Sequence, residues 1–140
     1  MKKIIFIFFT VSSYFSIGQV NSDECRKFTI GEFNNINNEN LTLNSVIIRN
    51  KNKQLEIVNG VKSNKNIRWL NDCDYILLFD KKEAKKDPFK KFINDNGGIS
   101  ISPEKIEGNT LYYKSYYFDG KRGVKGSGKL IKTSSNPEFR

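Results

Sequence analysis

The sequence predicts a mainly β protein, built as a single antiparallel up-and-down barrel of eight strands with one short helix. Eight short stretches alternate apolar and polar side chains, which is typical of half-buried strands. Turn signals rich in Asn, Asp and Gly separate many of these stretches, which favours hairpin connections. Only one stretch has helical spacing. Closure into a barrel would remove the exposed edges that a flat eight-stranded sheet would leave.

Residues 1–18 are expected to be a signal peptide. Two lysines follow the initiator Met and form a basic region, and residues 4–9 are an apolar core with small residues before Gln19. The apolar run is about a dozen residues, against roughly 20 that span a bilayer. Cleavage is therefore expected before Gln19, which leaves a barrel domain over residues 19–140. We expect this domain to be secreted or periplasmic, with no transmembrane segment in the mature chain.

Five strands are expected in the first half of the mature chain. They cover residues 25–33, 41–49, 54–58, 65–70 and 73–79. The phase of the alternation changes at Asn44 and Ser45, which indicates a bulge or the true start of the second strand. The clearest hairpin joins the last two strands through a polar corner at Asn71 and Asp72.

One short helix is expected after the fifth strand. Asp87 and Pro88 have the character of an N-cap and a first helical residue. Phe89, Phe92 and Ile93 then fall on one helix face, and an Asn-Gly-Gly sequence can end the helix. Because two helical turns are not stable alone, we expect this apolar face to pack on the sheet, over an open end of the barrel.

Three strands are expected after the helix. They cover residues 99–106, 110–118 and 124–132, and the first of them is bent at Pro103. Gly108 and Asn109 fit a two-residue hairpin turn. Two glycines on one face of the last strand would allow sharp curvature or the close approach of a neighbour.

The chain has two cysteines, Cys25 and Cys73, which suggest one disulfide in an exported protein. The bond would close a loop of about 49 residues, for which the chain-entropy model gives roughly 4 kcal/mol. Two buried free thiols are the alternative. The chain has no His, and two Cys alone do not make a zinc site, so we expect no metal and no cofactor.

With these elements in place, the chain resembles the small secreted lipocalin-like (calycin-type) β-barrel proteins of bacteria. The resemblance rests on Cys25-x-x-Phe28-x-x-Gly31-x-Phe33, Ile47-Ile48-Arg49, Gln54-Leu55-Glu56 and, above all, the Trp-Leu-Asn-Asp-Cys-Asp-Tyr-Ile-Leu sequence of residues 69–77. It covers roughly the first half of the mature chain, and the second half matches in layout. It implies a lipocalin-like barrel with Cys25 paired to Cys73, and it implies no activity.

No enzymatic activity is expected. The absence of His removes the usual general base. Asp72 and Asp74 could form a carboxylate pair, but their spacing is ordinary for a hairpin corner. The glycine-rich residues 125–129 lack the strand-to-helix context of a phosphate-binding loop.

The expected function is the binding of a small apolar or amphipathic ligand at the cell envelope, because a barrel of eight strands can hold one small ligand. The candidate lining residues are Trp69, Tyr75, Leu77, Tyr113 and Tyr117. Packing in the core is the plainer role for each of them. The alternative is a barrel with a solid core that acts as a protein-interaction module, such as an inhibitor or an adhesion accessory.

The formal net charge of +9 favours anionic partners, although solubility is the plainer explanation. Six lysines cluster around the expected helix: Lys81, Lys82, Lys85, Lys86, Lys90 and Lys91. A solvated helix face is their plainer role, and contact with anionic lipid or polysaccharide is the sharper hypothesis. Export argues against nucleic acid, although barrel strands that carry aromatics and Lys can stack bases. The oligomeric state is left open by the sequence.

Overall fold

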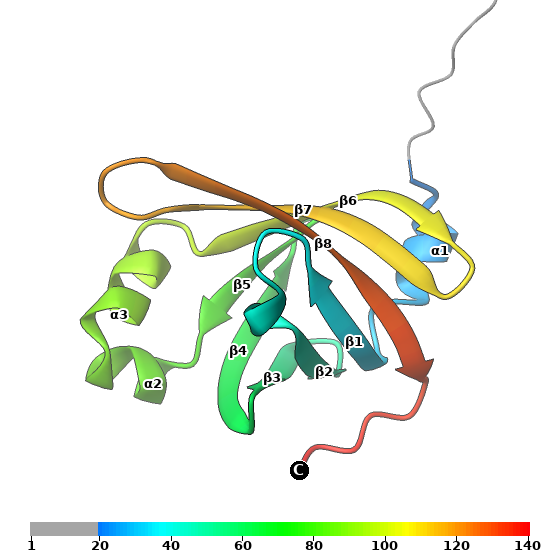
Figure 1. The fold of residues 1–140 in the computed structure, drawn as a ribbon, viewed down its shortest axis with the longest axis horizontal. Helices are drawn as coiled ribbons and strands as arrows, with labels where there is room; N and C mark the ends of the chain where they lie inside the picture. Colours follow the sequence, from blue (N-terminus) through cyan, green and yellow to red (C-terminus); the bar gives the residue numbers. More distant parts are fainter. Residues whose placement is uncertain (1–19) are drawn as a thin grey trace, which may run out of the picture.

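Apart from a helical insert and one 3-10 turn, residues 31–134 alternate extended segments with turns. The extended segments pair into a closed barrel in which every strand neighbours the next one in sequence. The structure is a computed structural model, and it describes residues 20–140 (Figure 1). The strands are β1 (Gly31–Asn37), β2 (Ser45–Arg49), β3 (Lys53–Val58), β4 (Val61–Trp69), β5 (Tyr75–Phe79), β6 (Ile99–Glu107), β7 (Thr110–Phe118) and β8 (Gly123–Ser134). The expected signal peptide, residues 1–18, lies outside the described residues.

All neighbouring strands are antiparallel, and β1 pairs with β8 as well as with β2. The predicted eight-stranded antiparallel barrel is therefore confirmed. The turn predicted at Gly108 and Asn109 is also present, because Glu107 and Thr110 are paired across it. β6 has a register shift between Pro103 and Lys105, where the sequence indicated a bend.

The prediction of a first strand over residues 25–33 was wrong at its start. Cys25 lies in a helix, α1 (Ser22–Arg26), and β1 begins only at Gly31. The side chain of Asn21 accepts a hydrogen bond from the Asp23 N–H and caps the helix. Two acidic residues in the first turn and Arg26 in the last turn complement the helix dipole.

The second predicted strand also begins later than its apolar pattern indicated. A 3-10 turn, η1 (Leu41–Leu43), precedes β2, and Asn40 caps it by accepting a hydrogen bond from the Thr42 N–H. β2 begins at Ser45, so the change of phase marks the true start of the strand.

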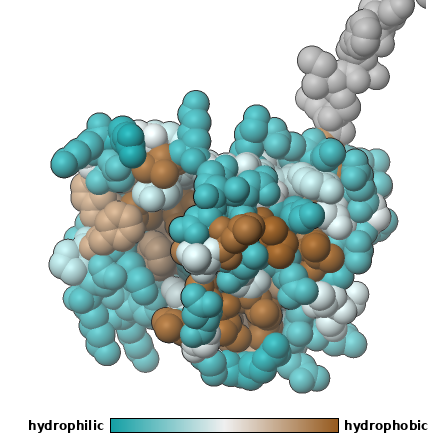
Figure 2. All heavy atoms as spheres, in the orientation of Figure 1, coloured by the Kyte–Doolittle hydropathy of each residue, from teal (hydrophilic) through white to brown (hydrophobic). Residues whose placement is uncertain are grey.

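An insert of two helices lies between β5 and β6, at the opposite end of the molecule from α1 (Figure 1). α3 (Pro88–Asp95) begins at the predicted cap, because Asp87 accepts hydrogen bonds from the Phe89 and Lys90 N–H groups. α2 (Lys81–Lys86), which Asp80 caps, was not predicted. Apolar side chains gather on the side of the molecule where the insert lies and, separately, over the strands (Figure 2).

Polar contacts fasten the insert to the barrel. Glu83 accepts hydrogen bonds from the Asn64 N–H at 2.7 Å, the Ser63 hydroxyl at 3.0 Å and Lys90 at 2.7 Å. The side chain of Asn94 bonds both the N–H and the carbonyl of Phe79, at 2.8 and 2.9 Å. The insert is therefore attached to both β4 and β5.

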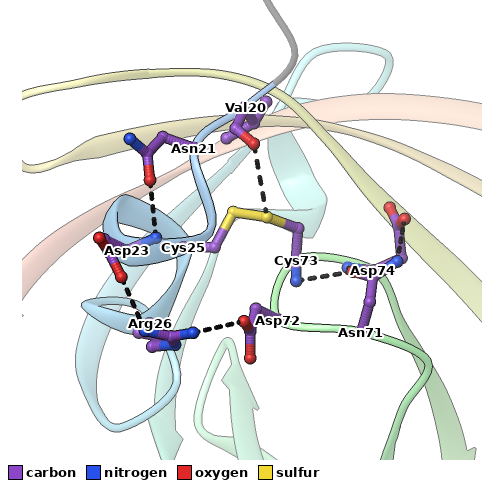
Figure 3. The surroundings of a disulfide bond; sticks show 9 residues. All are labelled: Val20, Asn21, Asp23, Cys25, Arg26, Asn71, Asp72, Cys73 and Asp74. Atoms are coloured by element: carbon purple, nitrogen blue, oxygen red, sulfur yellow. Dashed lines mark hydrogen bonds and ion pairs between the residues drawn. A yellow bond between two sulfur atoms is a disulfide. The ribbon is translucent and has the colours of Figure 1, made fainter.

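The disulfide predicted between Cys25 and Cys73 is present, and it joins α1 to the corner between β4 and β5 (Figure 3). Arg26 strengthens this junction by pairing with Asp23 at 2.7 Å and with Asp72 at 2.8 Å. Phe28, which follows α1, is buried and stacks on Phe33 of β1 with ring centroids 5.9 Å apart. α1 and the segment after it therefore close one end of the barrel.

None of the helices among residues 20–140 has the length and apolarity needed to cross a membrane.

Candidate ligand cavity

A cavity of about 250 Å³ lies inside the barrel and is lined by side chains from all eight strands. One end of the cavity is at the buried side chains of Tyr75 and Leu130. The other end is at Val58, Phe79 and Tyr117, which lie at or next to the last residues of β3, β5 and β7, beside the insert. Polar lining side chains gather on β1 to β4, together with Ile47 and Val58, whereas the lining side chains of β5 and β6 are apolar apart from the hydroxyl of Tyr75.

A chain of hydrogen bonds across five strands joins polar residues of the cavity wall through Ser45, which lies behind it. Tyr113 of β7 donates to Asn35 of β1 at 2.6 Å, and Asn35 donates to Ser45 of β2 at 3.1 Å. Ser45 donates to Glu56 of β3 at 3.2 Å, and Lys65 of β4 donates to the other carboxylate oxygen of Glu56. Asn35, Ser45 and Lys65 are buried, so the network stabilises polar groups that would be costly to bury alone.

A glycine allows Tyr113 to reach Asn35, although β8 lies between their strands. Gly128 of β8 is paired with Tyr113 of β7. A Cβ atom added at Gly128 would lie 2.6 Å from the Tyr113 hydroxyl oxygen. The tyrosine therefore crosses β8 where no side chain obstructs it. Burial, and after it the neighbouring Tyr75 and Glu56, raise the pKa of Tyr113, so its hydroxyl stays protonated and donates.

Arg49, at the end of β2, lies on the side of the cavity nearer to α1 and is 1 % exposed. Its Nε and Nη2 both donate to Oε1 of Gln54, at 3.0 and 2.7 Å. Nη1 donates to the carbonyl of Phe28 at 3.0 Å, and Nη2 donates to the Tyr75 hydroxyl at 2.8 Å. The guanidinium carbon is also 5.4 Å from the centre of the Phe33 ring. Arg49 thus joins the closed end of the barrel to the floor of the cavity.

A mainly apolar part of the wall comes from β5 and β6, which lie across the barrel from β1 and β2. Leu77, Ile99 and Ile101 supply its aliphatic side chains, and Ile47, Val58 and Leu130 add others from β2, β3 and β8. Aliphatic side chains here face the amide, hydroxyl and charged groups of the other wall. The cavity is therefore suited to a molecule with one polar end and one apolar end.

Four of the five lining residues proposed from the sequence do line the cavity: Tyr75, Leu77, Tyr113 and Tyr117. Trp69 lies outside it. Its ring is 4.8 Å from that of Tyr75, and its Nε1 donates to the carbonyl of Lys51 at 2.7 Å, toward the disulfide end. Sequence reasoning missed the polar lining residues, Asn35, Arg49, Gln54, Glu56 and Lys65. For Arg49, Gln54 and Glu56 the signal was their place on alternate positions of β2 and β3, whose other positions are apolar. Asn35 and Lys65 gave no such signal, because the other positions of β1 and β4 are mostly polar.

The six insert lysines lie at the end of the barrel that is opposite to α1 (Figure 1), and none of them lines the cavity. Five are exposed, and Lys90 is half-buried beside Glu83. Lys91 pairs with Asp95 at 2.5 Å. Phe89 is 52 % exposed and lies edge-on to Tyr117, a cavity residue, with ring centroids 6.4 Å apart. Positive charge and one exposed aromatic side chain therefore occur together beside the cavity.

A second hollow, of about 440 Å³, lies along β6, β7 and β8 and includes Glu39. Glu39 accepts hydrogen bonds from the Ser127 N–H and hydroxyl at 2.9 and 2.8 Å. The bond from the Ser127 N–H is the main reason that the pKa of Glu39 is lowered. None of the residues that line this hollow is buried, so the barrel cavity is the better-built site.

Within residues 20–140, no group of three or more His, Cys, Asp or Glu side chains is arranged to hold a metal ion. Comparisons with protein-family models, with curated proteins and with solved structures each give no match.

Proposed function

We propose that this protein is a non-enzymatic, lipocalin-like binding protein that holds one small amphipathic ligand inside its barrel. The observation that supports the proposal is the divided cavity, with a buried hydrogen-bond network on one wall and aliphatic side chains on the other. Its volume of about 250 Å³ is below the roughly 300–1,000 Å³ of pockets for drug-sized molecules, so the ligand is small.

The proposed place of action is the cell envelope or the exterior, after removal of residues 1–18. The disulfide between Cys25 and Cys73 supports this part of the proposal, because such bonds persist in oxidising compartments. The cavity also weighs against the alternative of a barrel with a solid core that works only through its outer surface.

Native mass spectrometry of the mature protein, purified from its own envelope fraction, tests the proposal. We expect a native mass above the denatured mass by that of one small molecule. The variant Ser115→Phe would fill part of the cavity, and Ser102→Phe, on an exposed position of β6, is its matched control. Loss of the extra mass in the first variant alone would place the ligand in the cavity. Equal native and denatured masses for the wild-type protein would contradict the proposal.

A second candidate function is contact with an anionic surface through the insert. Five exposed lysines and the exposed Phe89 favour it, since charged and aromatic side chains together suit a lipid surface. This contact would also bring the cavity close to the surface, so the two functions are compatible.

A further inference from the structure

We infer that the ligand of the barrel cavity is a small carboxylate whose anionic end binds at Lys65. The inference rests on the proposed ligand-binding function and adds the charge and the chemical class of the ligand. It is carried by the charged groups that line the cavity.

Among residues 20–140, three residues that line the cavity are charged: Arg49, Glu56 and Lys65. Glu56 and Lys65 form an ion pair and neutralise each other. Arg49 contacts a carbonyl, an amide oxygen and a hydroxyl, and within residues 20–140 no carboxylate lies within 4.0 Å of its guanidinium nitrogens. The lining therefore carries one net positive charge. A buried charge without a counter-charge is costly, and a monoanionic ligand would compensate it.

Lys65 is the better contact for the anion. Four hydrogen bonds already use the guanidinium of Arg49. An ammonium group has three N–H donors, and within the part of the chain that the structure describes the Lys65 ammonium makes one hydrogen bond, to Glu56. Gln54 is paired with Lys65 across the strands, and its oxygen is engaged by Arg49, so its amide nitrogen is a further donor beside the ammonium.

The apolar wall and the volume limit the rest of the ligand. Leu77, Ile99 and Ile101 would contact a short aliphatic or aromatic group. If each water-sized group occupies about 30 Å³, as in liquid water, the cavity of about 250 Å³ takes roughly eight non-hydrogen atoms. Hexanoate is a carboxylate of that size, and 1-hexanol and hexylamine are its neutral and cationic counterparts.

The test is isothermal titration calorimetry of the mature protein with hexanoate, 1-hexanol and hexylamine. We expect hexanoate to bind roughly tenfold or more tightly than 1-hexanol, as a charge-assisted hydrogen bond would allow, and hexylamine to bind most weakly. Equal affinity for hexanoate and 1-hexanol would overturn the carboxylate inference and leave the ligand-binding proposal intact. If none of the three binds, the inference fails, and the native mass of the envelope-purified protein decides the proposed function separately.

Two variants of the ion pair have opposite expected effects. Glu56→Gln removes the competing carboxylate and should raise the affinity for hexanoate, whereas Lys65→Met should remove the preference of hexanoate over 1-hexanol. Near-ultraviolet circular dichroism checks that each variant is folded. If Lys65→Met does not fold, Glu56→Gln is sufficient, because an unchanged or lowered affinity for hexanoate in that variant would contradict the inference.

Discussion

Tyr113 of β7 crosses directly over Gly128 of β8 and reaches the first strand of the barrel. A Cβ atom at Gly128 would lie 2.6 Å from the tyrosine hydroxyl and 2.5 Å from the backbone carbonyl of Ile36. The hydrogen bond to Asn35 depends on this close approach.

We therefore expect Gly128→Ala to lower the free energy of unfolding by about 1–3 kcal/mol, as overpacking usually does. Chemical denaturation measures the change. Gly126→Ala is the control, because its nearest neighbour is the hydroxyl of the Ser115 side chain, which can rotate away. Equal losses in the two variants would show that the crossing of Tyr113 is not the cause.

Replacement of Arg49 by Met should be among the most damaging substitutions. It leaves the Phe28 carbonyl, the Gln54 oxygen and the Tyr75 hydroxyl without their donor. Each buried group left unsatisfied costs about 1–3 kcal/mol, so we expect a loss of about 3 kcal/mol or more. Denaturant unfolding measures it, with Arg68→Met, at an exposed position of β4, as control. A loss no larger than that of the control would contradict this role for Arg49.

Removal of the disulfide by Cys25→Ser and Cys73→Ser together should lower stability by up to about 4 kcal/mol, because the bond closes a loop over a sequence separation of 48 residues. Thermal unfolding with and without a reductant checks this. The reductant should destabilise the wild-type protein and leave the double variant unchanged. An unchanged wild-type melting temperature after full reduction would contradict the prediction.

Acidification should loosen the contact of Glu83 with β4. Partial burial opposes ionisation, but hydrogen bonds from the Asn64 N–H, Lys90 and Ser63 outweigh it and lower the pKa of Glu83. The stabilisation is therefore complete above the ordinary pKa of 4.5 and is lost as the pH falls through the lowered value. The nuclear magnetic resonance shift of the Asn64 amide should follow this titration. A Glu83→Gln variant should abolish the pH dependence, and an identical titration in that variant would assign it to another group.

Replacement of the six insert lysines by Gln should abolish binding to vesicles that contain anionic lipid, if the insert binds such surfaces. Co-sedimentation measures the binding. The control carries the same charge change elsewhere, at Lys27, Lys51, Lys105, Lys114, Lys125 and Lys129. Equal loss in both variants would indicate a response to net charge alone, and persistent binding of the first variant would exclude the insert.

The sequence predicted best those elements whose signals are local. β7 has nine residues of alternating pattern between two turn signals, and its bounds were predicted as found. The helix α3 was predicted from its Asp87 cap and its three apolar residues. In both cases the local pattern and the tertiary packing favour the same structure.

The two helices that the sequence did not predict, α1 and α2, were missed for a common physical reason. α1 has five residues and only Cys25 is buried, so it lacks an apolar helical face, and its stability comes from its cap and from the disulfide. α2 has only Ala84 buried among its lysines. Helices of this kind depend on what they pack against. At α1 the apolar residues that follow suggested a longer strand instead, and at α2 the charged residues predicted no element.

The polar wall of the cavity was missed because the polarity of β3 is reversed. Leu55 is buried on the face away from the cavity, where it pairs with Ile48, while Gln54 and Glu56 face inward. Apolar periodicity normally marks the inner face of a strand. The inward polar groups are explained only by partners on other strands, which the local sequence does not reveal.

The pairing of β8 with β1 has a consequence for the order of events in folding. The first strand obtains its second neighbour only from the last one, so a nascent chain exposes the open edge of β1 until nearly all of it has been synthesised. The hairpins from β2 to β5 and the Cys25–Cys73 bond need only the first part of the chain. Ring closure is therefore a late, long-range step that is expected to limit the folding rate. During that interval, the unpaired edge strand is the segment most exposed to association with another chain.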